Sequence, residues 1–287
     1  MLQSRKRAFL NLCQTLDKRY QALQEVRHHS NNQMLRWCLL ALLLLNKQSA
    51  SMKLATSRAR VEAVLWDVDG TLSDSFALGF GATKTVLERN GIGAISDDDY
   101  HAGTKYTTPR RLAWHVTGNP DDPIGLELGK QFDDLYVDLV SPSTAPLYEG
   151  ILPMLSTLKK EDPSLKLGAL SNACGAYVKA VVECNSLSSL FPDVQLGADE
   201  VPAAKPSGAG LLHCAQLLSV DPSKCIYVGD SPSDAAAATN AGFLASVGVT
   251  WGSHKEEKVR AAFTYTAYSV EELTFILLAL MEGQDLV

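Results

Sequence analysis

The chain has 287 residues, of which 46% are hydrophobic and 20% are charged, so it holds enough apolar material for a large globular domain with a smaller insert. Its formal net charge of −6 is unevenly distributed, because 11 of the 26 Lys and Arg residues lie in residues 1–60 with only Asp17 and Glu25 of the 32 acidic residues. Residues 61–287 are therefore strongly acidic. This argues against nucleic acid as the main partner, since binding to phosphate backbones depends on Lys and Arg.

Residues 1–60 are basic, contain no Gly or Pro, and are expected to be a leader separate from the fold. Their apolar run, Trp37 to Leu45, has nine residues, whereas a membrane-spanning helix needs about 20. The run is long enough for a signal peptide, and an Arg-rich segment poor in acids is also typical of mitochondrial or plastid transit peptides. Alternatively, the segment precedes a true start at Met52 or forms a surface helix. We expect no stable membrane span, and the compartment, cytoplasmic or organellar, stays open.

Acidic side chains follow directly after the first apolar strand of the acidic body. Residues 61–66 predict a short buried strand, and Asp67 and Asp69 come immediately behind it. Like charges at the end of a buried strand are hard to solvate, so they indicate a functional site. Asp74, a little further along, is expected to cap the next helix together with Ser75.

Residues 76–147 predict an all-helical insert, because helix-like stretches there are separated only by Gly-, Asp- and Pro-rich turns. Beyond it, apolar strand-like runs alternate with helix-like stretches, which predicts a parallel sheet with helices on both faces. A capping box at Ser269 to Glu272 opens a terminal helix. The expected fold is α/β: a Rossmann-like, doubly wound parallel sheet over residues 61–75 and 148–287, with a small α-helical cap domain at 76–147. The helices expected in the insert cover 76–90, 109–117 and 125–139; the later strands cover 165–170, 225–228 and 245–249, and the helices between them 175–184, 207–218 and 233–241.

Polar residues end each of the later strands, as they do the first. Ser171 and Asn172 follow the second strand, and Asp230 and Asp234 follow the third. In parallel α/β sheets, ligands bind beyond the carboxyl ends of the strands, so these residues are expected to form one site with the opening acids. Lys205, just before Pro206, adds a cation at the start of a helix.

Clustered carboxylates near one lysine have two physical solutions, a shared proton or a bound hard cation. Mg²⁺ prefers oxygen ligands and usually keeps a substrate phosphate oxygen as well. Asp67 and Asp230, at neighbouring strand ends, could each supply one oxygen, and Lys205 and the Ser171 hydroxyl could hold the phosphate. A carboxylate in that position can attack phosphorus, and a second one two residues along can carry the proton.

The motifs Asp67-Val-Asp69-Gly70-Thr71-Leu72, Ser171-Asn172, Lys205-Pro206 and Gly229-Asp230-Ser-Pro-Ser-Asp234, in this order, resemble those of the haloacid dehalogenase superfamily. The resemblance covers residues 61 to about 282. It implies a Mg²⁺-dependent phosphatase acting on a small-molecule phosphate ester, similar to phosphoglycolate phosphatases. The β-phosphoglucomutases share the opening motif, which keeps a phosphotransferase as the alternative, and a non-catalytic relative with the same fold is a third possibility.

The resemblance also implies a role for each matching residue. Asp67 would be the nucleophile and a magnesium ligand, and Asp69 the general acid/base that also offers its backbone carbonyl to the metal. Asp69 further favours phosphate esters over carbon–halogen bonds, because dehalogenating members lack this second Asp. The remaining implied roles are support of Asp69 by Thr71, phosphate binding by Ser171 and Asn172, charge stabilisation by Lys205, and metal binding by Asp230 and Asp234.

The insert carries a dense basic segment that could read the substrate. Lys105, Arg110 and Arg111 lie within it, and any of them could pair with a carboxylate or second phosphate on the leaving group. The alternative is a solvated helix start at which the two arginines face water. The identity of the substrate and the oligomeric state are not readable from the sequence.

Overall fold

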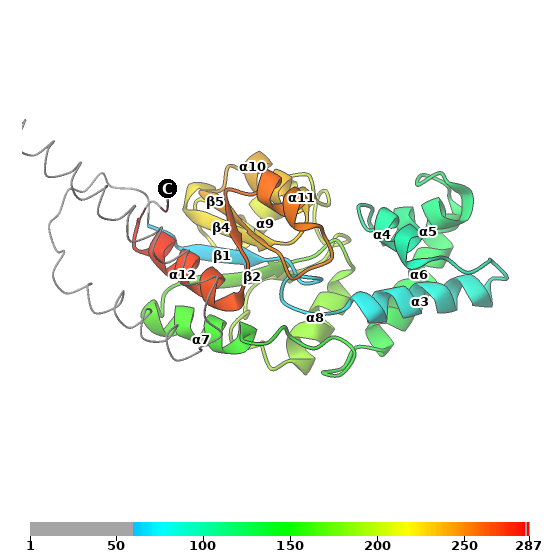
Figure 1. The fold of residues 1–287 in the computed structure, drawn as a ribbon, viewed down its shortest axis with the longest axis horizontal. Coiled ribbons are helices and arrows are strands. Elements are labelled where there is room, and N and C mark those ends of the chain that lie inside the picture. Colours follow the sequence, from blue (N-terminus) through cyan, green and yellow to red (C-terminus); the bar gives the residue numbers. More distant parts are fainter. Residues whose placement is uncertain (1–59, 285, 287) are drawn as a thin grey trace, which may run out of the picture. The chain divides into compact units, whose positions relative to one another are not determined.

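The computed structural model describes residues 60–284 and 286, so the predictions made for residues 1–59 lie outside it. Within the described residues, six strands form one parallel sheet in the order β3-β2-β1-β4-β5-β6 (Figure 1). The chain moves outward from β1 to β3 and then returns to β4, so the strand order reverses between β1 and β4, and a ligand crevice is expected there. The strands are β1 (Ala63–Trp66), β2 (Lys166–Leu170), β3 (Gln195–Leu196), β4 (Cys225–Gly229), β5 (Ala245–Val249) and β6 (Tyr265–Ala267).

Both faces of the sheet are covered, as the apolar sequence of β1 requires. Successive side chains of a strand point to opposite faces, and here Val64 and Trp66 enter one apolar cluster while Ala63 and Leu65 enter another. The first cluster lies under α7 (Ile151–Glu161), α8 (Gly175–Cys184) and α12 (Val270–Met281), and the second under α9 (Ala209–Leu217) and α10 (Pro232–Asn240). A short 3-10 helix, η2 (Pro222–Lys224), precedes β4, and α11 (Glu256–Ala262) packs beside α10.

The helical cap is inserted between β1 and α7, and its helices pack on one another (Figure 1). The expected α/β architecture, a doubly wound parallel sheet with an inserted helical cap, is confirmed. The exact domain boundaries at residues 76 and 147 stay a prediction. The cap helices are α3 (Phe76–Arg89), α4 (Asp97–Gly103), α5 (Thr108–Thr117) and α6 (Ile124–Asp138).

Several short elements were not anticipated from the sequence. The strands β3 and β6 have two and three residues, too few to show an alternating pattern. Helices α4 and α11 have seven residues each, and α7 carries Pro153 in its first turn, where a helix tolerates proline. At α12 the expected capping box is half formed, because Ser269 accepts from the backbone N–H of Glu272 while the Glu272 carboxylate accepts from Tyr268.

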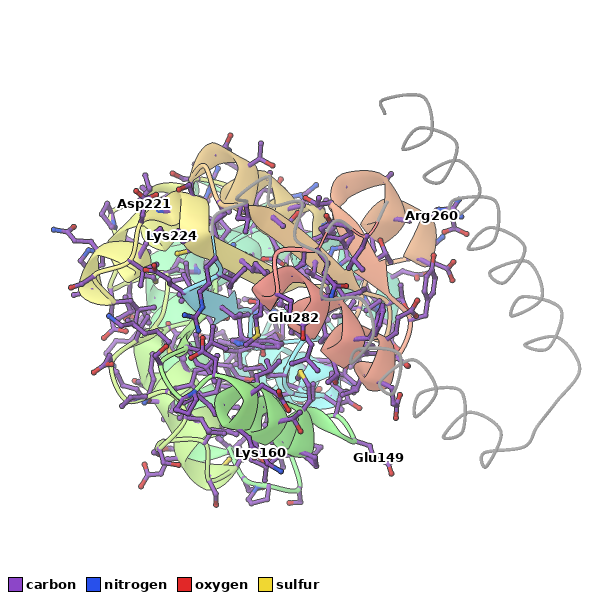
Figure 2. All side chains as sticks on the ribbon, turned by 90° about the vertical axis from the view of Figure 1, so that its left-hand side faces the viewer. Glu149, Lys160, Asp221, Lys224, Arg260 and Glu282 are labelled. Carbon is purple, nitrogen blue, oxygen red and sulfur yellow. The ribbon has the colours of Figure 1, made fainter. Side chains whose placement is uncertain are left out.

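Charged side chains surround the amino-terminal end of the strands. Lys224, just before β4, pairs with Glu62 at 2.7 Å, and Asp221 and Lys160 are exposed (Figure 2). Exposed pairs of this kind contribute little to stability, so this end of the sheet offers ordinary solvated surface. None of the described helices has the length and apolar character needed to cross a bilayer.

A cap carboxylate, Asp133 of α6, is half-buried beside the core near Cys174 and Asp199. Burial, followed by the charge of Asp199, raises the pKa of Asp133 to about 6. Between about pH 4 and pH 6 the folded protein therefore holds a proton there that the unfolded chain has released, so stability falls as pH rises through that range.

Replacing Asp133→Asn removes this charge, and should raise the free energy of unfolding by about 1 kcal/mol at pH 7.5 while changing it little at pH 4.5. The measurement is urea denaturation at both values of pH. The neighbouring Asp134→Asn is the control, because Asp134 is exposed and pairs with Lys130 at 2.6 Å. An equal effect of Asp133→Asn at both pH values would contradict the raised pKa assigned to Asp133.

Candidate active site

A tight turn at the end of β1 presents the first two acids. The backbone N–H of Asp67 still bonds to Val228 in β4 at 2.9 Å, and the chain then turns back through bonds from Leu72 and Ser73 to the carbonyl of Val68. Gly70 lies within the turn at φ +76°, and a Cβ there would stand 2.7 Å from Asp230 Oδ2. Glycine is required at this position, both for the backbone conformation and for the approach of Asp230.

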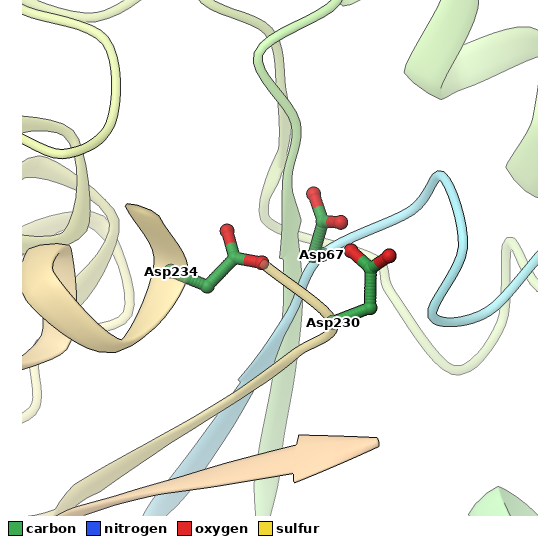
Figure 3. A group of neighbouring side chains, drawn as sticks. All are labelled: Asp67, Asp230 and Asp234. Carbon is green, nitrogen blue, oxygen red and sulfur yellow. The ribbon is translucent and has the colours of Figure 1, made fainter. Parts of the chain in front are cut away.

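Three carboxylates from separate elements meet at the carboxyl ends of the strands (Figure 3). Asp67 follows β1, Asp230 follows β4, and Asp234 lies in the first turn of α10, where it forms a capping box with Ser231. Their side chains are almost completely buried, and each offers an oxygen within 4.8 Å of the others. Buried carboxylate oxygens in this arrangement suit a hard divalent cation such as Mg²⁺.

Lys205 is the cation that holds two of these acids together. Its Nζ forms ion pairs with Asp67 Oδ1 and Asp234 Oδ1 at 2.6 Å each, and it donates hydrogen bonds to Asp67, to the Tyr227 hydroxyl at 2.9 Å and to the Leu170 carbonyl at 3.4 Å. Burial by itself would lower the pKa of Lys205, but the charges of Asp234 and Asp67 outweigh it and raise that pKa well above its usual value. The lysine therefore stays protonated.

The cluster keeps an excess of negative charge. Burial raises the pKa of Asp67 well above its usual value, and the charges of Asp234 and Asp230 raise it further, against the opposing effect of Lys205. Three buried carboxylates thus face one ammonium, and a second cation is needed to neutralise them all. The charge balance and the oxygen donors both fit a bound divalent metal.

The carboxylate of Asp69 lies apart from this group and is held by four hydroxyls. Ser75 and Tyr177 donate to Oδ1 at 2.6 Å each, Tyr136 donates to the same oxygen at 3.0 Å, and Ser171 donates to Oδ2 at 3.0 Å. Burial, and next the charge of Asp69, raise the pKa of both tyrosines well above the usual value, so both remain O–H donors. Asp69 was predicted as a metal ligand through its backbone carbonyl, and its side chain is not one of the three clustered carboxylates.

The expected capping of α3 by Asp74 and Ser75 is wrong. Ser75 does occupy the N-cap position and its carbonyl accepts from the N–H of Gly79 at 3.0 Å, but its side chain caps no helix N–H, because its hydroxyl donates to Asp69. Asp74 is exposed and lines the cavity beside the turn. The Asp69 carboxylate attracts the hydroxyl more strongly than the helix N–H groups do, since charge-assisted hydrogen bonds are the stronger ones.

The remaining core residues of the predicted site occupy the same region with contacts of their own. Thr71 donates to Asp67 Oδ2 at 3.4 Å, and not to Asp69, which it was expected to support. Asn172 uses its side-chain amide to bond both backbone groups of Lys205, at 2.9 and 3.0 Å. Ser171 bonds Asp69 and also accepts from the N–H of Ala173. Asn172 therefore fixes the backbone of the lysine, in addition to facing the cavity.

A cavity of about 470 Å³ joins these groups to the cap. Its volume falls within the usual range for small-molecule sites. Arg111 is the cap cation on its wall, and this side chain is only 5% exposed. On the core side the wall includes Trp251, whose ring N–H donates to the carbonyl of Thr71 at 3.2 Å. The lining from the cap and its hinges also includes Phe76, Tyr100, His101, Thr104, Tyr106, Thr108, Phe132, Tyr136 and Tyr148.

The basic segment of the cap divides between the cavity and the surface. Arg111 donates to Thr83 at 2.8 Å and lies over the rings of Tyr100 and Phe132, and it forms no ion pair with any carboxylate of the described residues. Arg110 is exposed and pairs with Asp121, while Lys105 lies over the rings of Tyr106 and Trp114. Neither Arg110 nor Lys105 belongs to the cavity wall.

Some site residues carried no signal in the sequence. Tyr136 and Tyr177 stand at apolar-periodic positions of their helices, and Tyr227 stands within a buried strand, so all three read as packing residues. Ser253 binds Asp230 Oδ2 through both its N–H (2.8 Å) and its hydroxyl (3.0 Å), from the loop that follows β5. These roles depend on side-chain geometry between elements, which no local pattern records.

Comparison with known proteins shows that the sequence and the fold are similar to those of hydrolases. The family model for haloacid dehalogenase-like hydrolases matches residues 64–247. A phosphoglycolate phosphatase of Vibrio vulnificus is 28% identical over 229 residues, covering 77% of this chain and 98% of its own, and one of Caulobacter vibrioides is 31% identical over 195 residues, covering 65% and 80%. A solved haloacid dehalogenase-like hydrolase from Bacteroides fragilis aligns with a TM-score of 0.66 at 26% identity, covering 75% of this chain and 100% of its own.

Removing the central ammonium should be costly. Lys205→Met leaves Asp67 and Asp234 buried without their cation, so we expect the free energy of unfolding to fall by about 3–5 kcal/mol at pH 7.5 without added metal. Urea denaturation measures the loss, which should shrink at pH 5 as the carboxylates take up protons. Lys179→Met is the matched control, because Lys179 pairs with Glu200 at the surface and should contribute less than about 1 kcal/mol. Equal losses for the two variants would contradict this account.

Proposed function

The chain belongs to the haloacid dehalogenase-like hydrolase family, and from this we propose that it is a Mg²⁺-dependent phosphatase that hydrolyses a small-molecule phosphate monoester. The observation that carries the proposal is the position of Asp67, whose carboxylate is buried beside two further carboxylates and one ammonium on the wall of the cavity. A nucleophile, a metal site and a cation for phosphate thus share one small region. The relatives named phosphoglycolate phosphatase support a small ester of that kind as substrate.

The proposed reaction has two steps. In the first, Asp67 attacks phosphorus and the ester P–O bond breaks, while the protonated carboxyl of Asp69 gives its proton to the departing alcohol oxygen. In the second, Asp69, now ionised, takes a proton from water as the water oxygen bonds to phosphorus. The bond between Asp67 and phosphorus then breaks, which releases inorganic phosphate and restores both carboxyl groups.

The other residues stabilise charge around these steps. Lys205, held between Asp67 and Asp234, stays close to the transferring group, and the backbone N–H groups beside Asn172 provide donors for phosphate oxygens. The Ser171 hydroxyl, which donates to Asp69 Oδ2 in this structure, would turn to a phosphate oxygen when the substrate binds. Asp67, Asp230 and Asp234 would hold the metal, the last directly or through water. When bound there, the ion would offset the repulsion between phosphate and the carboxylates and would polarise the P–O bonds.

The cap supplies a second site for charge. Arg111 is buried, faces the cavity and lacks a carboxylate partner among the described residues, so its guanidinium is available to an anionic group on the substrate. A planar guanidinium fixed between two rings can bind a carboxylate or phosphate through two parallel hydrogen bonds. We therefore assign substrate selection to Arg111 and to neither Arg110 nor Lys105.

The core of the proposal is tested by Asp67→Asn. The wild-type protein should release phosphate from p-nitrophenyl phosphate with Mg²⁺ and lose that activity in EDTA, and Asp67→Asn should lower the rate by on the order of 10³-fold or more. Asp193→Asn, an exposed acid outside the cavity, should leave it unchanged. Activity that survives in Asp67→Asn would exclude this nucleophile. A hexose 1-phosphate substrate that yields its isomer in place of free phosphate would show a phosphotransferase.

The role of Arg111 is tested by comparing two substrates. Arg111→Met should lower kcat/KM for phosphoglycolate by about 30-fold, the equivalent of losing about 2 kcal/mol from a buried charge pair. It should change p-nitrophenyl phosphate hydrolysis far less, because that ester lacks a second anion. Arg110→Met is the matched control, since Arg110 pairs with Asp121 at the surface. The same loss on both substrates would reduce Arg111 to a packing role.

A further inference from the structure

The Asp69 carboxylate is bound unevenly at its two oxygens. Three hydroxyls, from Ser75, Tyr136 and Tyr177, donate to Oδ1, whereas among the residues that the structure describes only Ser171 donates to Oδ2. A carboxylate oxygen has about two lone-pair sites, so Oδ1 is saturated and Oδ2 keeps room for another partner. Because Asp69 lies on the cavity wall, that partner can be the substrate.

Two of the donors form a rigid pair. The rings of Tyr136 and Tyr177 stack with centroids 4.1 Å apart at an interplanar angle of 15°, and Phe132 packs on Tyr136 at 4.8 Å. Both tyrosine side chains are buried, at 5% and below 1% exposure. Stacked and buried rings have little freedom to rotate, so their hydroxyls define a fixed position for Oδ1.

The pair also joins the two parts of the fold. Tyr136 belongs to α6 in the cap, and Tyr177 belongs to α8 in the core, yet both phenols reach the same oxygen of a residue at the end of β1. The orientation of Asp69 in this structure therefore depends on the cap resting against α8.

We propose that Tyr136 and Tyr177 are positioning residues that fix the Asp69 side chain through Oδ1, so that Oδ2 faces the cavity and exchanges the proton with the leaving group. The proposal rests on the acid/base role given to Asp69 in the proposed function. Neither tyrosine touches the reacting atoms; each acts through Asp69. Placing a catalytic group matters because a misplacement of about 1 Å can cost on the order of 10²-fold in rate.

The test uses Tyr136→Phe and Tyr177→Phe, which remove one hydroxyl each and keep the stacked rings. The values of kcat/KM report the steps up to departure of the alcohol, so they are compared for p-nitrophenyl phosphate, whose leaving group needs little protonation, and for an alkyl phosphate, whose leaving group needs it. Each variant should lower kcat/KM for the alkyl ester by about 10-fold or more and change that for the nitrophenyl ester by less than about threefold. The double variant should lose less than the product of the single losses, because both hydroxyls serve one oxygen.

Tyr265→Phe is the control for the chemical change, since this half-buried tyrosine of β6 lies outside the cavity wall. Thermal melting of all variants shows whether the fold is intact. Equal losses on both esters, or no loss on either, would overturn the positioning role while leaving the phosphatase proposal in place. A wild-type protein without Asp67-dependent hydrolysis would instead overturn the proposed function, so the two failures are distinguishable.

Discussion

The ion pairs of the Lys205 ammonium with Asp67 and Asp234, each at 2.6 Å, are the constraint on which the rest of this structure depends. Burying several carboxylates at one end of a sheet is unfavourable unless cations and hydrogen bonds compensate them. A single ammonium makes the cluster possible without neutralising it. The remaining negative charge has the sign and oxygen chemistry that a divalent metal needs, so stability and function arise from the same imbalance.

The topology explains why these groups can meet although they are far apart in the chain. Lys205 follows β3 at one side of the sheet, while Asp67 and Asp230 follow the central strands β1 and β4, where the strand order reverses. Around them, backbone and side-chain bonds fix the loops: Asn172 holds the backbone of Lys205, and Ser253 holds Asp230. The site is therefore built from strand ends, and hydrogen bonds from the neighbouring loops fix Lys205 and Asp230 in place.

The sheet and most of the acid cluster could be predicted from the sequence. The carboxyl ends of parallel strands lie at one edge of a sheet, and the polar residues that follow each strand can be identified in the sequence. The acids of the cluster, Lys205, Ser171 and Asn172 were predicted in that way, and the doubly wound fold followed from the alternation of strands and helices. The direction in which each side chain points could not be predicted from the sequence. Arg110 and Arg111 are adjacent in sequence, but one pairs with Asp121 in solvent and the other is buried on the cavity wall. Which face of α5 packs inward depends on α6, and no local pattern in α5 specifies its partner.

The roles of Tyr136 and Tyr177 could not be predicted for the same reason: the sequence does not show which way a side chain points. A tyrosine in an amphipathic helix supplies an apolar ring for packing and a hydroxyl for bonding, so its spacing reports only the first. Tyr136 and Tyr177 use both parts, since their rings stack across the junction of cap and core while their hydroxyls bind Asp69. In the proposed function, the core supplies the nucleophile, the metal ligands and the phosphate donors, and the cap supplies Arg111. Asp69 accepts hydroxyl hydrogens from both parts, so the orientation of its carboxylate depends on contacts across the junction of cap and core.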